Sequence, residues 1–354
     1  MLCLAVRSSL SEYEIDYYPS YEEWSSFLEE HDSENLQQSF EWGEILKLLR
    51  PGTKIMRLLL KKDGESVGLV QGFYQGGRIL GRPLNVEGFH GTGPVIAIGQ
   101  NRKLVFRQLF LALEKYAIMN RITQGQIICE SETVNVLRSL GYTHFFSHCI
   151  YNILLDNNVD QIWRRIDHNK RRNIRKAISC GVEVTHGTSK EDLVSFYEML
   201  QLTSDREGFE IRPFNYYNEI LKVFGKIGKA NIFTAYYRDQ PVAGLFVVTM
   251  GNTAHSLSAG SRPEFWRFRP NDILHWKSIE LACKKGLSCY NMGAVPDPPG
   301  GSLWRWKKEW MGDLKKMPIY RRVYMPKLKL VFDTYGKIMT RKIERTLTAL
   351  LRRV

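Results

Sequence analysis

The chain presents the same order of predicted elements twice, and this duplication restricts its fold more than any single motif does. Each half contains three short apolar segments separated by turns that contain Asp or Gly. Asp63 and Asp239 lie in the first turn of each set, Gly68 and Gly244 lie in the segment that follows, and both pairs are 176 positions apart. Since apolar runs bounded by such turns are typical of hairpins, each half predicts a three-stranded antiparallel meander.

Helices are predicted around both meanders, because apolar residues recur there at three- and four-residue spacing. The predicted helical regions are 13–50, 102–120, 133–140, 160–179, 190–206, 214–224 and 271–285. Further strands are predicted at 125–129, 145–155, 182–185 and 288–292. The expected class is α/β (α+β), with two tandem domains that each have a mixed central sheet flanked by helices. We expect a first domain over residues 1–155, completed by 325–354, and a second over 156–324.

Composition argues against several classes of protein. No run of apolar residues approaches the roughly eighteen that a membrane-spanning helix needs. The six cysteines are scattered and form no Cys-x-x-Cys pair, which favours free thiols in a reducing cytoplasm over disulfides or a zinc site. We therefore expect a cytoplasmic protein that binds no metal.

Basic residues gather in two segments of a chain whose net charge is +13. Residues 163–176 contain seven lysines and arginines and one aspartate, and residues 321–354 contain ten against two acidic residues. Such concentrations suggest a polyanionic partner, which is RNA, a phosphorylated substrate or an anionic membrane surface. A solvated basic face is the alternative for either segment alone.

The stretch 290–312, YNMGAVPDPPGGSLWRWKKEWMG, combines a strand end, a loop rich in Pro and Gly, and an aromatic helix. Leu303, Trp306, Lys307 and Trp310 recur at three- and four-residue spacing, which predicts that they share one helix face. A lysine between tryptophans at the end of a sheet is suited to an anionic ligand with a flat ring. The alternative is a core helix whose lysine reaches past the aromatic rings to solvent.

Four segments together point to a family. They are QSFEW at 38–42, NKRRNIRKA at 169–177 with the GVEV that follows, Arg206 with IRP at 211–213 and the tyrosine pair at 216–217, and WKKEW at 306–310. They resemble the FemABX family of peptidyltransferases, and the resemblance extends over nearly the whole chain. It implies two tandem domains with the GNAT acyltransferase fold.

The resemblance also implies an activity. FemABX members take an amino acid from aminoacyl-tRNA and transfer it to an amine on the peptide of a cell-wall precursor, which builds the peptidoglycan cross-bridge. Aminoacyl-tRNA is then the co-substrate, no cofactor is needed, and the acceptor is a cell-wall precursor peptide, soluble or lipid-linked. Both substrates are anionic, in agreement with the two basic segments.

Catalytic roles follow from the same resemblance. Lys307 matches the family lysine that supplies positive charge at the donor end, and Trp306 is expected to stack on the terminal base. Glu130, at the end of a predicted strand, is expected to steer or deprotonate the incoming amine. A solvent-facing glutamate is the simpler interpretation of Glu130.

Binding residues are expected in both domains. Arg212 can grip acceptor phosphates or a carboxylate through its bidentate guanidinium group, with Tyr216 one helical turn later, and Trp42 is expected in the first domain. A cap-and-core role for residues 211–217 is the alternative. The predicted contacts to tRNA phosphates, which carry no sequence specificity, are Arg164, Lys170, Arg171, Arg172, Arg175 and Lys176.

Two departures from the family pattern put the acceptor in question. Family members that act on soluble nucleotide precursors have a lysine two residues past the early tryptophan, and this chain has Glu44 there. An aromatic residue of the second domain is replaced by Ser258.

Two other functions stay open on the sequence. An N-acyltransferase that uses acyl-CoA, such as acetyl-CoA, shares the fold, but its pyrophosphate-binding turn, Arg/Gln-x-x-Gly-x-Gly/Ala, has only partial matches at Arg78 and Arg138. A non-catalytic RNA- or membrane-binding protein is the second. Residues 336–354 have one apolar and one basic stripe, which suits peripheral contact with an anionic membrane at its inner face or a helix that closes the first domain.

Overall fold

The structure is a computed structural model of the whole chain. It describes residues 12–334, apart from positions 32, 34, 49–51, 80–81, 93–94, 97–98, 130 and 332. Glu130 and the segment 336–354 lie outside the described residues. No helix in the described part of the chain is long and apolar enough to cross a membrane.

The chain forms two compact units. The first draws on Met1–His31, Gln37–Phe146 and Pro318–Val354, and the second on Asp32–Leu36 and Ser147–Met317. Apart from the short segment Asp32–Leu36, the chain passes from the first unit to the second within strand β7 (Thr143–Leu154) and returns within β13 (Asp313–Val323). Because both crossings lie inside strands, no linker marks them in the sequence.

The strands of the first unit follow the order β1-β2-β3-β4-β6-β13. They are β1 (Tyr13–Asp16), β2 (Thr53–Lys62), β3 (Glu65–Ile79), β4 (Arg82–Thr92) and β6 (Gln124–Ile128), with β5 (Val95–Ile96) paired to β3. The sheet is mixed, since β4 and β6 pair in parallel whereas the meander β2-β3-β4 is antiparallel.

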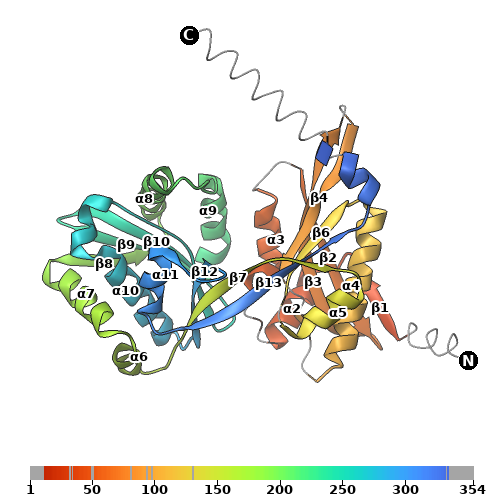
Figure 1. Cartoon of the computed structure of the whole chain (residues 1–354). Helices are drawn as coiled ribbons and strands as arrows, with labels where there is room; N and C mark the ends of the chain where they lie inside the picture. Colours follow the sequence, from red (N-terminus) through yellow and green to blue (C-terminus); the bar gives the residue numbers. More distant parts are fainter. Residues whose placement is uncertain are drawn as a thin grey trace, which may run out of the picture. The chain divides into compact units, whose positions relative to one another are not determined.

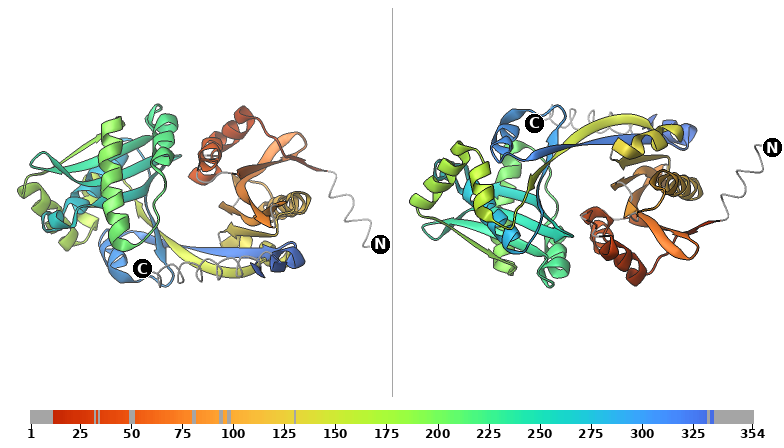
Figure 2. Two further views of the ribbon diagram at one scale, coloured as in Figure 1. Left: turned by 90° about the horizontal axis from the view of Figure 1, so that it is seen from above. Right: turned by 90° about the horizontal axis from the view of Figure 1, so that it is seen from below.

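Alternation along β2 explains why this sheet has helices on both faces. Leu58 and Leu60 join one apolar cluster with α4 (Arg102–Met119) and α5 (Val134–Ser139), whereas the equally buried Leu59 points to the other face. The helices α2 (Tyr21–Glu30) and α3 (Phe40–Leu46) cover that second face, and both views in Figure 2 show them opposite α4.

The second unit repeats the plan with the strand order β7-β12-β11-β10-β9-β8. Its strands are β8 (Val182–Gly187), β9 (Ala230–Tyr237), β10 (Gln240–Met250), β11 (Thr253–Ser261) and β12 (Cys289–Pro296). Parallel pairing between β11 and β12 runs from Thr253–Cys289 to His255–Asn291 and stops there, although both strands continue. The two strands therefore separate on the side where β12 leads into the next helix.

Helices cover both faces of this sheet as well. In Figure 1, α8 (Lys190–Glu207) and α9 (Phe214–Ile220) lie on one face, and α7 (His168–Ser179), α10 (Pro270–Lys284) and α11 (Gly301–Lys308) lie on the other. The short helix α6 (Val159–Arg165) precedes α7. Glycine permits the close approach of α8, because a Cβ on Gly260 would lie 2.3 Å from the carbonyl oxygen of Met199.

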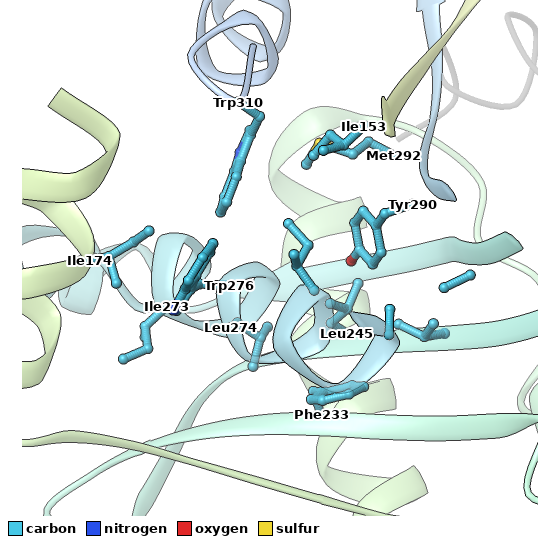
Figure 3. Packing of buried hydrophobic residues seen from close by; sticks show 14 of the residues in the cluster. Ile153, Ile174, Phe233, Leu245, Ile273, Leu274, Trp276, Tyr290, Met292 and Trp310 are labelled. Carbon is cyan, nitrogen blue, oxygen red and sulfur yellow. The ribbon is translucent and has the colours of Figure 1, made fainter. Parts of the chain in front are cut away.

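The core of the second unit lies between its sheet and α10. Figure 3 shows Trp310, just past the end of α11, pointing into this cluster, with Ile273 and Trp276 from α10 and Tyr290 from β12 around it. Trp310 and Tyr290 are both fully buried. The segment that follows β12 is thus attached to the core by an aromatic residue.

The predicted class, tandem domains with mixed sheets flanked by helices, is confirmed, and the local errors have physical causes. Residues 13–16 form a strand instead of a helix, and the predicted helix 160–179 is two helices, because the side chain of Asp167 caps the start of α7. Strand β13 was not predicted, since its sequence DLKKMPIYRRV shows little apolar alternation. Leu303 is 54% exposed, so it does not share the buried face of Lys307 and Trp310.

Candidate active site in the second unit

An irregularity in β12 shapes the start of the site. The register between β12 and β7 shifts between Asn291 and Ala294, and Gly293 adopts a φ of 80°. The side chain of Asn291 accepts a hydrogen bond from the backbone N–H of Gly293 at 2.7 Å, which stabilises this bulge. Ala294 is exposed beyond it. The bulge therefore lets the backbone carbonyl group of Ala294 face α11.

Lys307 of α11 lies against this bulge. Its side chain is 5% exposed, and Nζ donates a hydrogen bond to the carbonyl oxygen of Ala294 at 3.0 Å. Burial lowers the pKa of Lys307 to about 8, because a buried ammonium loses hydration. The residue thus presents an amine that is still largely protonated at neutral pH, next to an exposed stretch of strand.

Trp306 is held from two directions. Its Nε1–H donates to Oδ1 of Asp272 at 2.7 Å, and the ammonium of Lys170 lies 4.4 Å from the centre of its ring system. One face of the indole is therefore occupied, and stacking on a base would have to use the other. Trp306 is half-buried, and its stacking on the terminal base stays a prediction.

Lys170 is the clearest correction to the predicted phosphate contacts. Its side chain is fully buried, and Nζ donates to Asp272 at 2.6 Å and lies 3.2 Å from Oε2 of Glu309. Its ammonium also lies 5.0 Å from the centre of the Trp310 ring system. A cation with all of these partners inside the unit is unavailable to a polynucleotide at the surface.

The other five predicted contacts divide into two groups. Arg171 donates to the carbonyl oxygens of Trp163, Arg164 and Ile166, so it caps the C-terminal end of α6. The remaining side chains are exposed on α6 and α7: Arg164, Arg172, Arg175 and Lys176. These four remain predicted phosphate contacts.

His275 and Tyr290 lie beneath the tryptophans. The Nδ1 atom of His275 is 2.9 Å from the hydroxyl oxygen of Tyr290. Burial, and after it the charges of Lys170 and Lys307, lowers the pKa of His275 to about 3, while burial raises the pKa of Tyr290. Both groups are therefore neutral near pH 7.

The predicted acceptor residues of the second unit lie around α9. Arg212 is exposed just before this helix, whereas Tyr216 is 8% exposed and burial raises its pKa. The hydroxyl of Tyr217 is 3.0 Å from that of Ser258, so the serine that replaces the family aromatic pairs with the helix. The tyrosines pack this segment, as the cap-and-core alternative expects, whereas acceptor binding by the exposed Arg212 stays a prediction.

The predicted residue of the first unit has a packing role. Trp42 is 7% exposed in α3, and its backbone N–H donates to the side chain of Ser39, which caps the helix. Glu44, which stands where family members that act on soluble nucleotide precursors are expected to have a lysine, forms an ion pair with Arg57 at 2.9 Å.

Sequence reasoning missed Asp272 and Glu309. An acidic residue in the first turn of a helix is ordinary, because it favours the helix dipole, so Asp272 gave no signal in the sequence. Its partner Lys170 is 102 positions away. Only the packing of α7 against α10 and α11 shows that these charges belong to one cluster.

The comparisons with known proteins agree with this architecture. Residues 164–322 match the model of an acetyltransferase (GNAT) domain. The lipid II:glycine glycyltransferase of Staphylococcus aureus is 20% identical over 423 aligned residues, which cover 92% of this chain and 98% of that protein.

Two solved structures match over most of their length. FemX matches with a TM-score of 0.75 at 18% identity, covering 90% of this chain and 99% of that one. A tandem GNAT protein from the clavulanic acid biosynthesis pathway matches with a TM-score of 0.59 at 12% identity, covering 88% and 99%. These matches confirm the predicted tandem GNAT fold.

Proposed function

Because this chain belongs to the FemABX family of tandem GNAT-fold acyltransferases, we propose that it is an aminoacyltransferase of peptidoglycan bridge formation. The donor is aminoacyl-tRNA, and the acceptor is an amine on the peptide of a cell-wall precursor. The full-length similarity to a lipid II:glycine glycyltransferase supports a lipid-linked acceptor.

The position of Lys307 is the observation that supports this function most strongly. In the reaction the acceptor amine attacks the ester carbonyl of the donor, a C–N bond forms, and the bond to the tRNA oxygen breaks. The ester is already activated, so the protein needs mainly to orient the two reactants and to stabilise the oxyanion of the tetrahedral intermediate. A buried ammonium held by one carbonyl oxygen, with two further N–H donors, is suited to that task.

Exposed basic residues support a polynucleotide donor. Arg164, Arg172, Arg175 and Lys176 lie on α6 and α7, and α7 also supplies the buried Lys170 beneath Trp306. The same helix therefore connects a basic surface with the site of Lys307. Contacts of this type bind phosphates without reading the sequence of the RNA.

The start of α10 argues against acyl-CoA as the donor. In the GNAT fold a pyrophosphate group would bind to free N–H groups at a helix N-terminus. Here Pro270, which lacks an N–H group, occupies the first helical position, Arg269 precedes it with a φ of 59°, and Asp272 lies in the first turn. The missing N–H group of Pro270 and the carboxylate of Asp272 both disfavour the binding of a pyrophosphate at this position.

The acceptor is proposed to bind near Arg212. This exposed arginine precedes α9, and its planar guanidinium group can bind a phosphate or carboxylate through two parallel hydrogen bonds. Tyr216 and Tyr217, packed behind it, fix the segment that presents it.

Transfer of labelled amino acids from a charged total-tRNA pool tests this function. Purified lipid II and its soluble nucleotide-linked counterpart are the acceptors, and parallel reactions contain ribonuclease or labelled acetyl-CoA in place of the charged tRNA. We expect labelled product that ribonuclease abolishes, and the amino acid in that product identifies the donor. Product from acetyl-CoA alone would contradict the proposal.

A further inference from the structure

Two oppositely charged side chains, Lys170 and Asp272, are buried beside the site, where apolar side chains could fill the same space. Lys170 is fully buried, Asp272 is 2% exposed, and their charged atoms are 2.6 Å apart. Burying an ion pair costs hydration free energy that its attraction often does not repay, and replacing both partners by apolar residues is often neutral or stabilising. The pair therefore calls for an explanation other than stability.

Both charged groups contact the segment that holds Lys307. Oδ1 of Asp272 accepts from Lys170 and also from Nε1–H of Trp306 at 2.7 Å. The ammonium of Lys170 lies 4.4 Å from the centre of the Trp306 ring system and 5.0 Å from that of Trp310. The carboxylate thus fixes the edge of the indole, and the ammonium fixes its face.

These contacts determine how α11 is rotated about its axis. Trp306 and Lys307 are consecutive in the helix, so their side chains leave it about 100° apart. With the indole held toward Asp272, Lys307 is directed to the carbonyl oxygen of Ala294 at 3.0 Å. Glu309 directly follows the helix, and its ion pair with Lys170 at 3.2 Å anchors the end of α11.

We propose that Lys170 and Asp272 are positioning residues, which hold the Trp306 side of α11 and thereby keep the ammonium of Lys307 at the edge of β12. This inference rests on the role proposed for Lys307 and adds two residues that do not touch the substrates. Asp272 binds both Lys170 and Trp306, so the pair acts as one unit.

The decisive variant replaces both charges together. Lys170→Met with Asp272→Leu retains the approximate volume and removes both buried charges together. Glu309 loses its ion pair, but its side chain is 30% exposed and can be hydrated, so the chain is expected to fold. The indole loses its hydrogen-bond acceptor and the cation over its face, and α11 is free to rotate. We expect kcat to fall by about 100-fold, since a displacement of about 1 Å at a reacting group has an effect of that size. The KM for the donor and the KM for the acceptor are expected to change little.

Thr234→Val is the matched control. Thr234 is fully buried in β9 of the same unit, and its hydroxyl has no hydrogen-bond partner among the residues that the structure describes. The substitution changes a buried polar side chain by one atom, away from α11, and is expected to leave kcat within about twofold of wild type.

A double-mutant cycle separates positioning from a general structural effect. In a Lys307→Ala background the paired substitution is expected to lower kcat by less than about threefold, because there is no ammonium left to position. An equal loss in both backgrounds would overturn the proposal, and so would a folded double variant with full kcat. If the double variant does not fold, the same cycle is measured with Asp272→Glu. This substitution keeps the charge but moves the oxygen that accepts from Trp306 by the length of about one methylene group.

A second readout does not depend on transfer activity. Reductive methylation of Lys307, followed by mass spectrometry across pH, reports its local environment in the free protein. We expect the paired substitution to change the pH profile of this labelling and Thr234→Val to leave it unchanged. If the wild-type protein showed no transfer at all, the proposed function would fail, but the labelling would still test the positioning. A labelling profile that the paired substitution left unchanged would overturn the positioning itself.

Discussion

Both units place a helix after the strand that pairs in parallel within their sheet, and the two helices differ in what they bury. In the first unit α5, VNVLRS, follows β6 and buries Leu137. In the second unit α11, GSLWRWKK, follows β12 and buries Lys307. Both units thus have a helix at this position of the duplicated scaffold, but only the helix of the second unit buries an ionisable group.

The buried polar groups show the same contrast. Among the described residues of the first unit these groups are uncharged, and the side chain of Gln38 binds the backbone of Gln71 through two hydrogen bonds. The second unit buries Lys170, Asp272 and Lys307. Neutral networks hold elements in place at modest cost, whereas buried charges are costly and tend to mark functional sites. This contrast is the reason for placing the proposed chemistry in the second unit.

The largest effect is expected from removing the ammonium of the second unit. Lys307→Ala is predicted to lower kcat by about 10²–10³-fold, the usual loss when one group that stabilises an oxyanion is deleted. Arg138→Ala, in α5 of the first unit, removes an exposed cation from the corresponding helix and is predicted to have no effect. Steady-state transfer kinetics check both, with circular dichroism to establish folding. Equal activity of the two variants would remove the contrast between the units.

A second prediction compares the two buried networks. Lys170→Ala leaves Asp272 buried without its ammonium partner, and the free energy of unfolding is expected to fall by about 3–5 kcal/mol. Gln38→Ala in the first unit leaves neutral groups unpaired and is expected to cost about 1–3 kcal/mol. Urea denaturation followed by tryptophan fluorescence measures both. A smaller loss for Lys170→Ala than for Gln38→Ala would show that the charged pair is not embedded as the structure describes.

The scaffold itself can be tested at two glycines. A Cβ on Gly260 would lie 2.3 Å from a backbone oxygen of α8, whereas a Cβ on Gly43 in the first unit would meet the end of the Gln71 side chain at the same distance. Backbone cannot move aside as a side chain can, so Gly260→Ala is expected to cost about 1–3 kcal/mol and Gly43→Ala less. Thermal unfolding of both variants checks the order, and the reverse order would contradict this packing of α8.

The smallest predicted effect is a pH dependence that belongs to the second unit. Because burial lowers the pKa of Lys307 to about 8, the protonated form, which is proposed to stabilise the oxyanion, is lost as pH rises through about 8. The kcat of transfer is then expected to fall about tenfold per pH unit above that value. Spontaneous hydrolysis of the donor ester is subtracted at each pH. A rate that rises through pH 8 would instead make Lys307 a general base.

The same pKa has a consequence for stability. A lysine whose pKa is lower in the folded state binds fewer protons there than in the unfolded chain between about pH 8 and its ordinary range. Its burial therefore opposes folding at neutral pH, and this cost is relieved as pH rises through that window. A Lys307→Met variant is expected to be at least as stable as wild type at pH 7.

The sequence predicted the scaffold better than the charged cluster, for physical reasons. The meanders and long helices follow from turns and apolar spacing, which act locally. Nothing local distinguishes Lys170 from the basic residues beside it, since its burial depends on Asp272, on Trp306 of α11 and on Trp310 just past that helix. The cap formed by Arg171 also had no local signal, because it depends on the break between α6 and α7, which gives its side chain carbonyl oxygens to bind.

Protection of lysines from chemical labelling tests the assignment of donor chemistry to the second unit most directly. The protein is reductively methylated with and without an aminoacyl-tRNA whose 3′ linkage is a non-hydrolysable amide, and each lysine is quantified by mass spectrometry. The account predicts that the donor protects Lys307 and leaves Lys103 and Lys115, exposed on α4 of the first unit, labelled as before. Protection of the lysines of α4 with Lys307 unchanged would contradict it.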